Sequence, residues 1–350
     1  MRVGIDAGPH FVPHVRGISD GMTEMTITAN TAEKSTDQRS SALKRQRLND
    51  VIFRHLTRAS AITVLLLLGG VMVSLLVGSW PAISKFGFGF LATETWNPVT
   101  EQFGSLAPVY GTLVTAGIAM LIGVPVSLGI AVFLTEICPP ILRRPIGIAV
   151  ELLAGIPSII YGIWGLFVFA PVLQRTLQPW LIATFHHIPG LNNLFAGPPF
   201  GIGVLTASLI LAIMVLPFIT SIARDVFETV PPMLKEAAYG LGCTRWEVVR
   251  NIVIPYTRTG VIGGVMLGLG RALGETMAVT FVIGNAHRIS SSILAPGTTI
   301  SATIANEFSE AEGATYTSSL IALGLILFFI TFVVLAAARL MLMRLEKKAG

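Results

Sequence analysis

Six long apolar stretches alternate with polar segments along the chain. They lie at residues 59–78, 110–137, 146–171, 200–222, 260–284 and 318–339. A helix needs about 20 predominantly apolar residues to cross a bilayer, so each stretch is predicted to be a transmembrane helix. The fragment 179–185 is too short to span and is expected at the interface. The pattern predicts an all-α integral membrane protein with six transmembrane helices.

Composition supports this fold class. Of the 350 residues, 53% are hydrophobic and 12% are charged, whereas soluble domains carry about 25% charge. The net charge of +5 therefore indicates membrane orientation and lipid contact rather than nucleic-acid binding. Residues 1–57, rich in Ser and Thr, are predicted to be a disordered cytoplasmic tail, and residues 58–345 a six-span domain.

Basic residues predict the orientation. They gather before the first stretch, between the second and third, between the fourth and fifth, and at the C-terminus, whereas the alternate loops hold only Lys85, Arg175 and Arg288. Because Lys and Arg are enriched in cytoplasmic loops, both termini and the loop 223–259 are expected in the cytoplasm.

The loop 223–259 contains signals for two short helices. Gly242 follows a helix-forming run in the position of a C-terminal cap. Thr244 and Glu247 fit a capping box that starts a second helix. Pro255 is predicted to end that helix, because the residue before a proline avoids helical geometry. A loop of this length is either a plain connector or a docking element for a cytosolic partner, and we favour docking.

The same loop resembles the EAA motif of bacterial ABC importer permeases, E-A-A-x3-G-x9-I-x-L-P. The matching residues are Glu236, Ala237, Ala238, Gly242, Ile252 and Pro255. The one departure is Ile254 in place of Leu. The resemblance implies that this loop is the coupling helix that sits in a cleft of an ATP-binding subunit.

Residues 151–162, 270–285 and 292–300 resemble phosphate permeases of the PstC type. This resemblance extends over about residues 57–345. It implies the type I ABC importer permease (MetI-like) fold and a high-affinity phosphate importer in the bacterial inner membrane. The implied partners are a dimer of PstB-like ATP-binding subunits, a PstA-like second permease and a periplasmic PstS-like phosphate-binding protein.

No enzymatic site is predicted. A P-loop needs a Gly-Lys pair to hold nucleotide phosphates, and the chain contains none, nor any H-E-x-x-H pattern. ATP is therefore expected on a partner chain, and no cofactor, catalytic residue or metal ligand is expected in this one.

Two charges fall inside the fifth stretch. Arg271 and Glu275 are four residues apart, which predicts one shared helix face that Gly264 and Gly268 continue. Charged residues inside membranes usually face a cavity or a partner. They could form a structural ion pair or a phosphate path, and the PstC resemblance implies phosphate translocation. Glu136 and Glu151 are weaker candidates that could simply reach the interface.

Three alternatives stay open from the sequence. A permease for sulfate or molybdate would carry the same EAA loop. A passive channel with a regulatory loop would carry solute without ATP. A membrane-embedded enzyme would need a catalytic set that the sequence does not contain.

Overall fold

The computed structural model describes residues 17–347, with side chains for residues 49–340 and 343. The structure is helical, with one isolated β-bridge between Asn97 and Gln102 among the described residues. Its elements, in chain order, are α1 (Gly17–Phe86), α2 (Gly89–Ala92), α3 (Leu106–Val132), η1 (Phe133–Ile137), α4 (Pro140–Ala154), α5 (Ser158–Trp164), η2 (Gly165–Phe169), α6 (Ala170–Arg175), α7 (Leu177–Phe185), α8 (Leu191–Leu194), α9 (Val204–Glu228), α10 (Pro232–Gly240), α11 (Arg245–Val248), η3 (Val249–Val253), α12 (Ile254–Leu273), α13 (Met277–Val282), α14 (Ile300–Glu307) and α15 (Ala314–Lys347).

Six helical runs in the described residues are long and apolar enough to cross a membrane. They are Asn49–Phe86, Leu106–Ile137, Ser158–Phe185, Val204–Glu228, Arg245–Leu273 and Ala314–Leu340. This confirms the predicted all-α, six-span architecture. The first, second, fourth and sixth runs overlap their predicted stretches closely.

The N-terminal segment is helical from Gly17 in α1, where the sequence predicts a disordered tail. No proline occurs between Pro13 and Pro81, so nothing in this segment prevents helical geometry. Residues 1–16 of the predicted tail lie outside the described residues. The chain divides into two units, Met1–Val71 and Met72–Gly350, and the predicted domain boundary after residue 57 remains a prediction.

The third span begins later than the sequence predicts. Residues 146–154 belong to α4, a separate helix, and the span runs from Ser158 to Phe185. Pro157 has an extended backbone, with φ −55° and ψ 136°, and it separates α4 from α5. The fragment 179–185 belongs to α7, the last helix of this run, and its interfacial position stays a prediction. Apolar content alone did not reveal this break, because α4 is itself half apolar.

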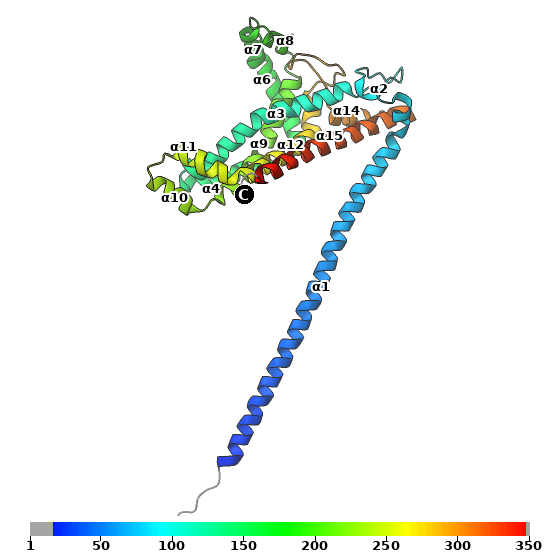
Figure 1. Ribbon diagram of the computed structural model, residues 1–350. Helices are drawn as coiled ribbons and strands as arrows, with labels where there is room; N and C mark the ends of the chain where they lie inside the picture. Colours follow the sequence, from blue (N-terminus) through cyan, green and yellow to red (C-terminus); the bar gives the residue numbers. More distant parts are fainter. Residues whose placement is uncertain (1–16, 348–350) are drawn as a thin grey trace, which may run out of the picture. The chain divides into compact units, whose positions relative to one another are not determined.

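The core of the second unit forms around α9. Of the 18 consecutive residues that are most apolar in this helix, 67% are buried. The same share is 17–28% in the other spans that lie wholly in this unit. Ile210, Val215 and Ile219 of α9 are fully buried, and α3 and α12 pack against this helix (Figure 1). The remaining spans leave apolar faces outward, as expected for helices that meet lipid or another subunit.

Three glycines bring α12 close to α9. A Cβ atom added at any of them would come too close to a side chain of α9. The distance would be 2.6 Å to Val226 from Gly260, 2.8 Å to Ile222 from Gly264, and 2.7 Å to Ile219 from Gly268. Glycine therefore serves close helix packing at these positions. Gly264 and Gly268 face a packed helix rather than a space for solute.

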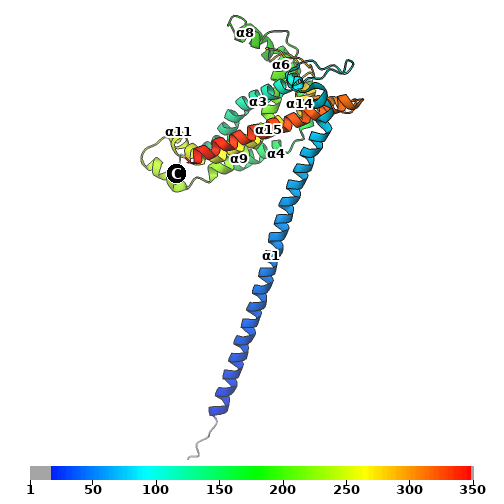
Figure 2. The same ribbon diagram turned by 45° about the vertical axis from the view of Figure 1, so that its right-hand side comes forward.

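The two ends of the bundle carry different elements. Both views place α7 and α8 at the opposite end from α10 and α11 (Figures 1 and 2). The loop with the EAA pattern thus lies at one end, called here the α10 end. The segment between α13 and α14 contacts α8 at the other end, called here the α8 end, where Ile293 N–H donates to the Leu194 carbonyl (3.0 Å).

Candidate functional site

The turn after α10 is a Schellman motif. Gly242 has φ +86°, a conformation that glycine adopts without steric cost. Its N–H donates to the Tyr239 carbonyl (2.9 Å), and Cys243 N–H donates to the Ala238 carbonyl (3.1 Å). These two bonds satisfy the last carbonyls of α10. The predicted glycine cap is confirmed.

A capping box starts the following helix. Thr244 N–H donates to Glu247 Oε2 (2.7 Å), and Glu247 N–H donates to Thr244 Oγ1 (3.4 Å). The predicted capping box is confirmed. The turn is therefore fixed on both sides by its own hydrogen bonds, and α10 and α11 keep one relative geometry.

The helix that starts here does not end at Pro255. It runs on through η3 into α12 and ends at Leu273, so the prediction of a second short helix was wrong. Pro255 stands at the second residue of α12, directly after the π-helical turn of η3. The wider π turn accommodates a proline ring that would clash with a regular α-helix.

The EAA residues divide between an inner and an outer face. Ala238 is buried in a cluster with Phe227, Val248 and Val253, and Ile252 packs against the same cluster. Glu236, Ala237, Gly242 and Pro255 are exposed. The inner residues hold the loop to the bundle, and the outer ones are available to a partner.

Large apolar side chains project from the same loop. Leu241 is 86% exposed, Met233 77% and Trp246 64%. We call Met233, Leu241 and Trp246 the apolar crest. Met233 lies in α10, Leu241 caps that helix and Trp246 lies in α11. Exposed apolar side chains of this size are typical of a protein interaction surface.

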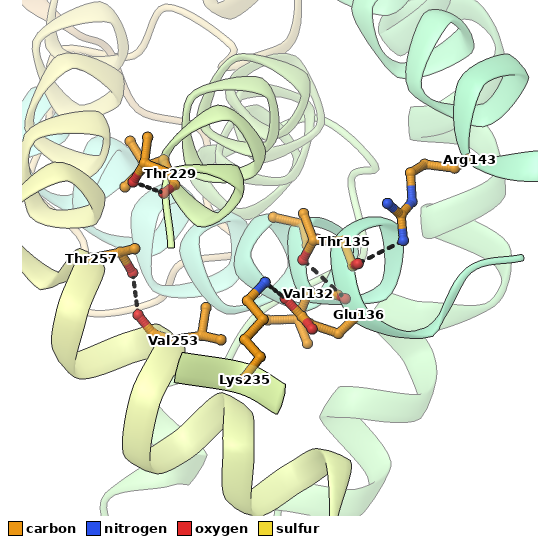
Figure 3. A network of polar contacts seen from close by, with 10 residues as sticks. Val132, Thr135, Glu136, Arg143, Thr229, Lys235, Val253 and Thr257 are labelled. Atoms are coloured by element: carbon orange, nitrogen blue, oxygen red, sulfur yellow. Dashed lines mark hydrogen bonds and ion pairs between the residues drawn. The ribbon is translucent and has the colours of Figure 1, made fainter. Parts of the chain in front are cut away.

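Ion pairs tie this loop to the ends of the spans (Figure 3). Lys235 Nζ lies 2.5 Å from Glu136 Oε1, and the Glu136 side chain is only 6% exposed. The Arg143 guanidinium donates to the Thr135 carbonyl (2.7 Å). Lys235 thereby joins α10 to η1, and Arg143 joins α4 to η1. Glu136 does not reach the interface alone but is buried and paired.

Glu151 is likewise paired. Its carboxylate lies 2.7 Å from the Arg224 guanidinium, which also contacts Asp225 at 2.9 Å. Both Glu136 and Glu151 therefore have structural partners. In the sequence, each of these two residues is visible only as an acidic residue near the end of an apolar stretch. Its basic partner could not be predicted, because the partner lies more than 70 residues away.

Arg271 and Glu275 do not share a helix face. Helix α12 ends at Leu273, and α13 begins at Met277. Glu275 Oε1 accepts a hydrogen bond from Ala278 N–H (3.2 Å) at the start of α13. Arg271 is exposed in the last turn of α12, and its guanidinium lies 5.9 Å from the Phe218 ring centroid. The prediction of one face was wrong because the helix breaks at Gly274, and the two side chains form no ion pair within the described residues.

A second polar cluster surrounds Glu307, at the end of α14. Its carboxylate accepts hydrogen bonds from Trp96 Nε1 (2.6 Å), the Tyr316 hydroxyl (2.7 Å) and His287 Nε2 (2.7 Å). Burial acts to raise the pKa of Glu307, but these bonds outweigh it and hold the pKa below its ordinary value. Sequence reasoning missed this cluster, because Trp96 and Glu307 are 211 residues apart.

The part of the chain that the structure describes contains no group of three or more His, Cys, Asp or Glu side chains placed to hold a metal ion. Cys138 and Cys243 are free thiols. The arrangement around the α10 end thus consists of ion pairs and helix caps.

Known proteins resemble this chain over most of its length. Residues 127–347 match the family described as the binding-protein-dependent transport system inner membrane component. The chain is 70% identical over 312 residues to the phosphate transport system permease protein PstC of Mesorhizobium japonicum, which covers 89% of this chain and 95% of that protein.

Two solved structures share the fold at 17% identity. One is a bacterial alginate ABC transporter in complex with its pentasaccharide-bound periplasmic protein, with a TM-score of 0.56 over 85% of this chain and 98% of that chain. The other is the inward-facing MetNI methionine ABC transporter, with a TM-score of 0.51 over 71% of this chain and 99% of that chain. The predicted type I importer permease fold is therefore confirmed, and this multi-pass chain belongs to the inner-membrane components of binding-protein-dependent transport systems, within the PstC family of phosphate transport permeases.

Proposed function

We propose that this chain is a permease subunit of a high-affinity, ATP-driven phosphate importer, and that loop 223–259 couples it to a separate ATPase. One observation carries the proposal. The helical run Arg245–Leu273 starts at the capping box, carries Trp246 of the apolar crest in its first turn and Arg271 in its last turn. A helix of this length reaches about 40 Å, so it connects the α10 end of the bundle to the break at Gly274–Thr276.

The loop is suited to receive mechanical work. Its turn is closed by the Schellman motif and the capping box, and Lys235 fixes it to Glu136. The exposed crest offers apolar area to a partner, as EAA loops do for their ATP-binding subunits. A displacement imposed on this stiff element would pass along the helix to the break at Gly274–Thr276, in the manner of rigid-element coupling.

Arg271 is proposed to contact phosphate. A guanidinium binds phosphate oxygens with paired hydrogen bonds, and Arg271 forms no ion pair with a described carboxylate. Glu275, four residues on, would limit how tightly the anion is held, so that phosphate can leave. The relative at 70% identity carries the name of a phosphate permease, which supports phosphate as the substrate.

The proposed complex has four further chains of three types: two PstB-like ATP-binding subunits at the α10 end, a PstA-like permease beside this chain, and a PstS-like binding protein at the α8 end. The α10 end and both termini would face the cytoplasm. ATP would bind only the partner subunits, and this chain would need no cofactor.

Reconstitution of the purified complex in proteoliposomes tests the proposal. We expect phosphate to accumulate only when the ATP-binding subunits are present and ATP is supplied at the α10 end. Labelled phosphate uptake should resist an excess of sulfate or molybdate. Uptake abolished by sulfate would assign another oxyanion, and equilibration of phosphate without the ATPase would indicate a passive channel.

A further inference from the structure

The segment between α13 and α14 forms one wall of a cavity of about 370 Å³ at the α8 end. Its polar lining consists of Asn193, Arg288, Ser290, Ser291 and Ser292, and no carboxylate lines it. One cation, the hydroxyl groups of Ser290 and Ser291 and the Asn193 amide form a donor set that matches a tetrahedral oxyanion.

Arg288 is available for a ligand. Its side chain is exposed, and its guanidinium forms no ion pair with any described carboxylate. Glu94, an acidic residue close to this segment, accepts the Ile289 backbone N–H instead and does not line the cavity. The cavity therefore has one cationic side chain and no carboxylate in its lining.

Three hydrogen bonds to other parts of the chain hold the segment Ser290–Ile293 in place. Ser292 Oγ donates to the Ala196 carbonyl (2.6 Å), Ile293 N–H to the Leu194 carbonyl (3.0 Å), and the Tyr110 hydroxyl to the Ser290 carbonyl (3.1 Å). Within the segment, Ser292 N–H donates to Ser290 Oγ (3.1 Å). An anion binding here would not have to order a flexible loop, which lowers the cost of binding.

Arg288 also lines a second, narrower pocket. That pocket continues to Tyr110 and Gly111 of α3, to Val204 at the start of α9 and to Thr298. Arg288, Ser290 and Ser292 line both spaces. They thus stand between the outer cavity and the helices of the bundle.

We propose that Arg288 and Ser290–Ser292 form an oxyanion site that receives phosphate at the α8 end before the anion enters the bundle. This inference rests on the proposed function and adds a binding site separate from Arg271. The guanidinium supplies the charge and paired hydrogen bonds, and the Ser290 and Ser291 hydroxyls donate to the remaining oxygens. Ser292, whose hydroxyl donates to the Ala196 carbonyl, holds the wall in place.

The test places a reporter thiol in the cavity wall. Ser291→Cys is introduced into the full complex in detergent without binding protein, and modification of residue 291 by a maleimide is followed by peptide mass spectrometry. We expect phosphate to slow labelling, and Arg288→Gln to weaken this protection about tenfold, because a charge-assisted hydrogen-bonded contact is lost. Arg175→Gln, which removes an exposed cation outside the cavity, should leave the protection unchanged.

Three results would overturn the site: no protection in a complex that transports phosphate, protection that survives in Arg288→Gln, or protection by sulfate but not by phosphate. A loss of binding-protein affinity in Arg288→Gln with unchanged protection would make Arg288 a protein contact and also overturn it. Protection in a complex that transports no phosphate would retain the site and refute the proposed function, so the two failures are distinguishable.

Discussion

At the scale of single residues, the position of a charge decides its role. Glu136 and Glu151 are neutralised by Lys235 and Arg224, so they hold the bundle together. Arg271 is exposed at the C-terminal end of α12, where the helix dipole favours a cation. An exposed guanidinium without a carboxylate partner remains free to meet an anion.

Substitution of Arg271 distinguishes a role in phosphate transport from a role in assembly of the complex. We expect Arg271→Gln to abolish phosphate uptake while the complex assembles in normal yield, because the side chain is exposed and forms no ion pair with a described carboxylate. Uptake in proteoliposomes and subunit yield on purification provide the measurements. Arg339→Gln, at another exposed arginine, is the control, and normal uptake by Arg271→Gln would remove the residue from the path.

We predict from the hydrogen bonds of the Glu307 carboxylate that the stability of the fold depends on pH. Its hydrogen bonds place the folded pKa below the ordinary value of 4.5. The carboxylate therefore stabilises the fold fully above that pH, and the contribution is lost as the pH falls through the folded pKa. Thermal unfolding in detergent should show Glu307→Gln less stable than the unmodified protein at pH 7, with the difference shrinking as the pH falls below 4.5. A difference that stays constant with pH would contradict this assignment.

At the scale of elements, the turn between α10 and α11 depends on one backbone conformation. Gly242 has φ +86°, whereas Gly240 lies in the helix, and an added Cβ would meet nothing within 4 Å at either position. The two glycines therefore differ in backbone strain and not in space, which makes them a matched pair.

Gly242→Ala should disturb the turn by about 1–2 kcal/mol, the cost of a left-handed residue with a side chain, and should weaken coupling to the ATPase. Gly240→Ala should be neutral or slightly stabilising, since alanine favours a helix more than glycine does. Co-purification of the ATP-binding subunits and substrate-stimulated hydrolysis are the readouts. Equal behaviour of both variants would show that the turn conformation is not needed for coupling.

At the scale of the whole molecule, the bundle depends on how closely α12 approaches α9. The Gly268 position leaves no room for a side chain beside Ile219 and Val215, whereas a Cβ at Gly263 meets nothing within 4 Å. We expect Gly268→Val to lower the free energy of unfolding by about 1–3 kcal/mol more than Gly263→Val, through overpacking. Denaturation of the purified protein in detergent measures the difference, and equal losses would mean that α9 and α12 are not in such close contact.

Much of the element-level description could be read from local sequence. The six apolar stretches predicted the six spans, and Gly242 with the Thr244–Glu247 capping box predicted the turn. Spans and turns could be predicted because each depends on residues that are close together in the sequence. The sequence did not reveal the break after Leu273, and it placed the start of the third span at Ile146 rather than at Ser158. Apolar residues lie on both sides of each break, and packing decides where a helix inside a bundle ends.

The sequence by itself determined the fold class, the number of spans, the geometry of the EAA turn and the family. Only the tertiary structure decided that Glu136 pairs with Lys235, that Trp96, His287 and Tyr316 converge on Glu307, and that Arg271 and Glu275 lie on different elements. The reason is physical: helix formation and capping depend on neighbours within one or two turns. The partner of a buried charge is chosen by whichever distant segment the packed bundle brings within hydrogen-bonding distance.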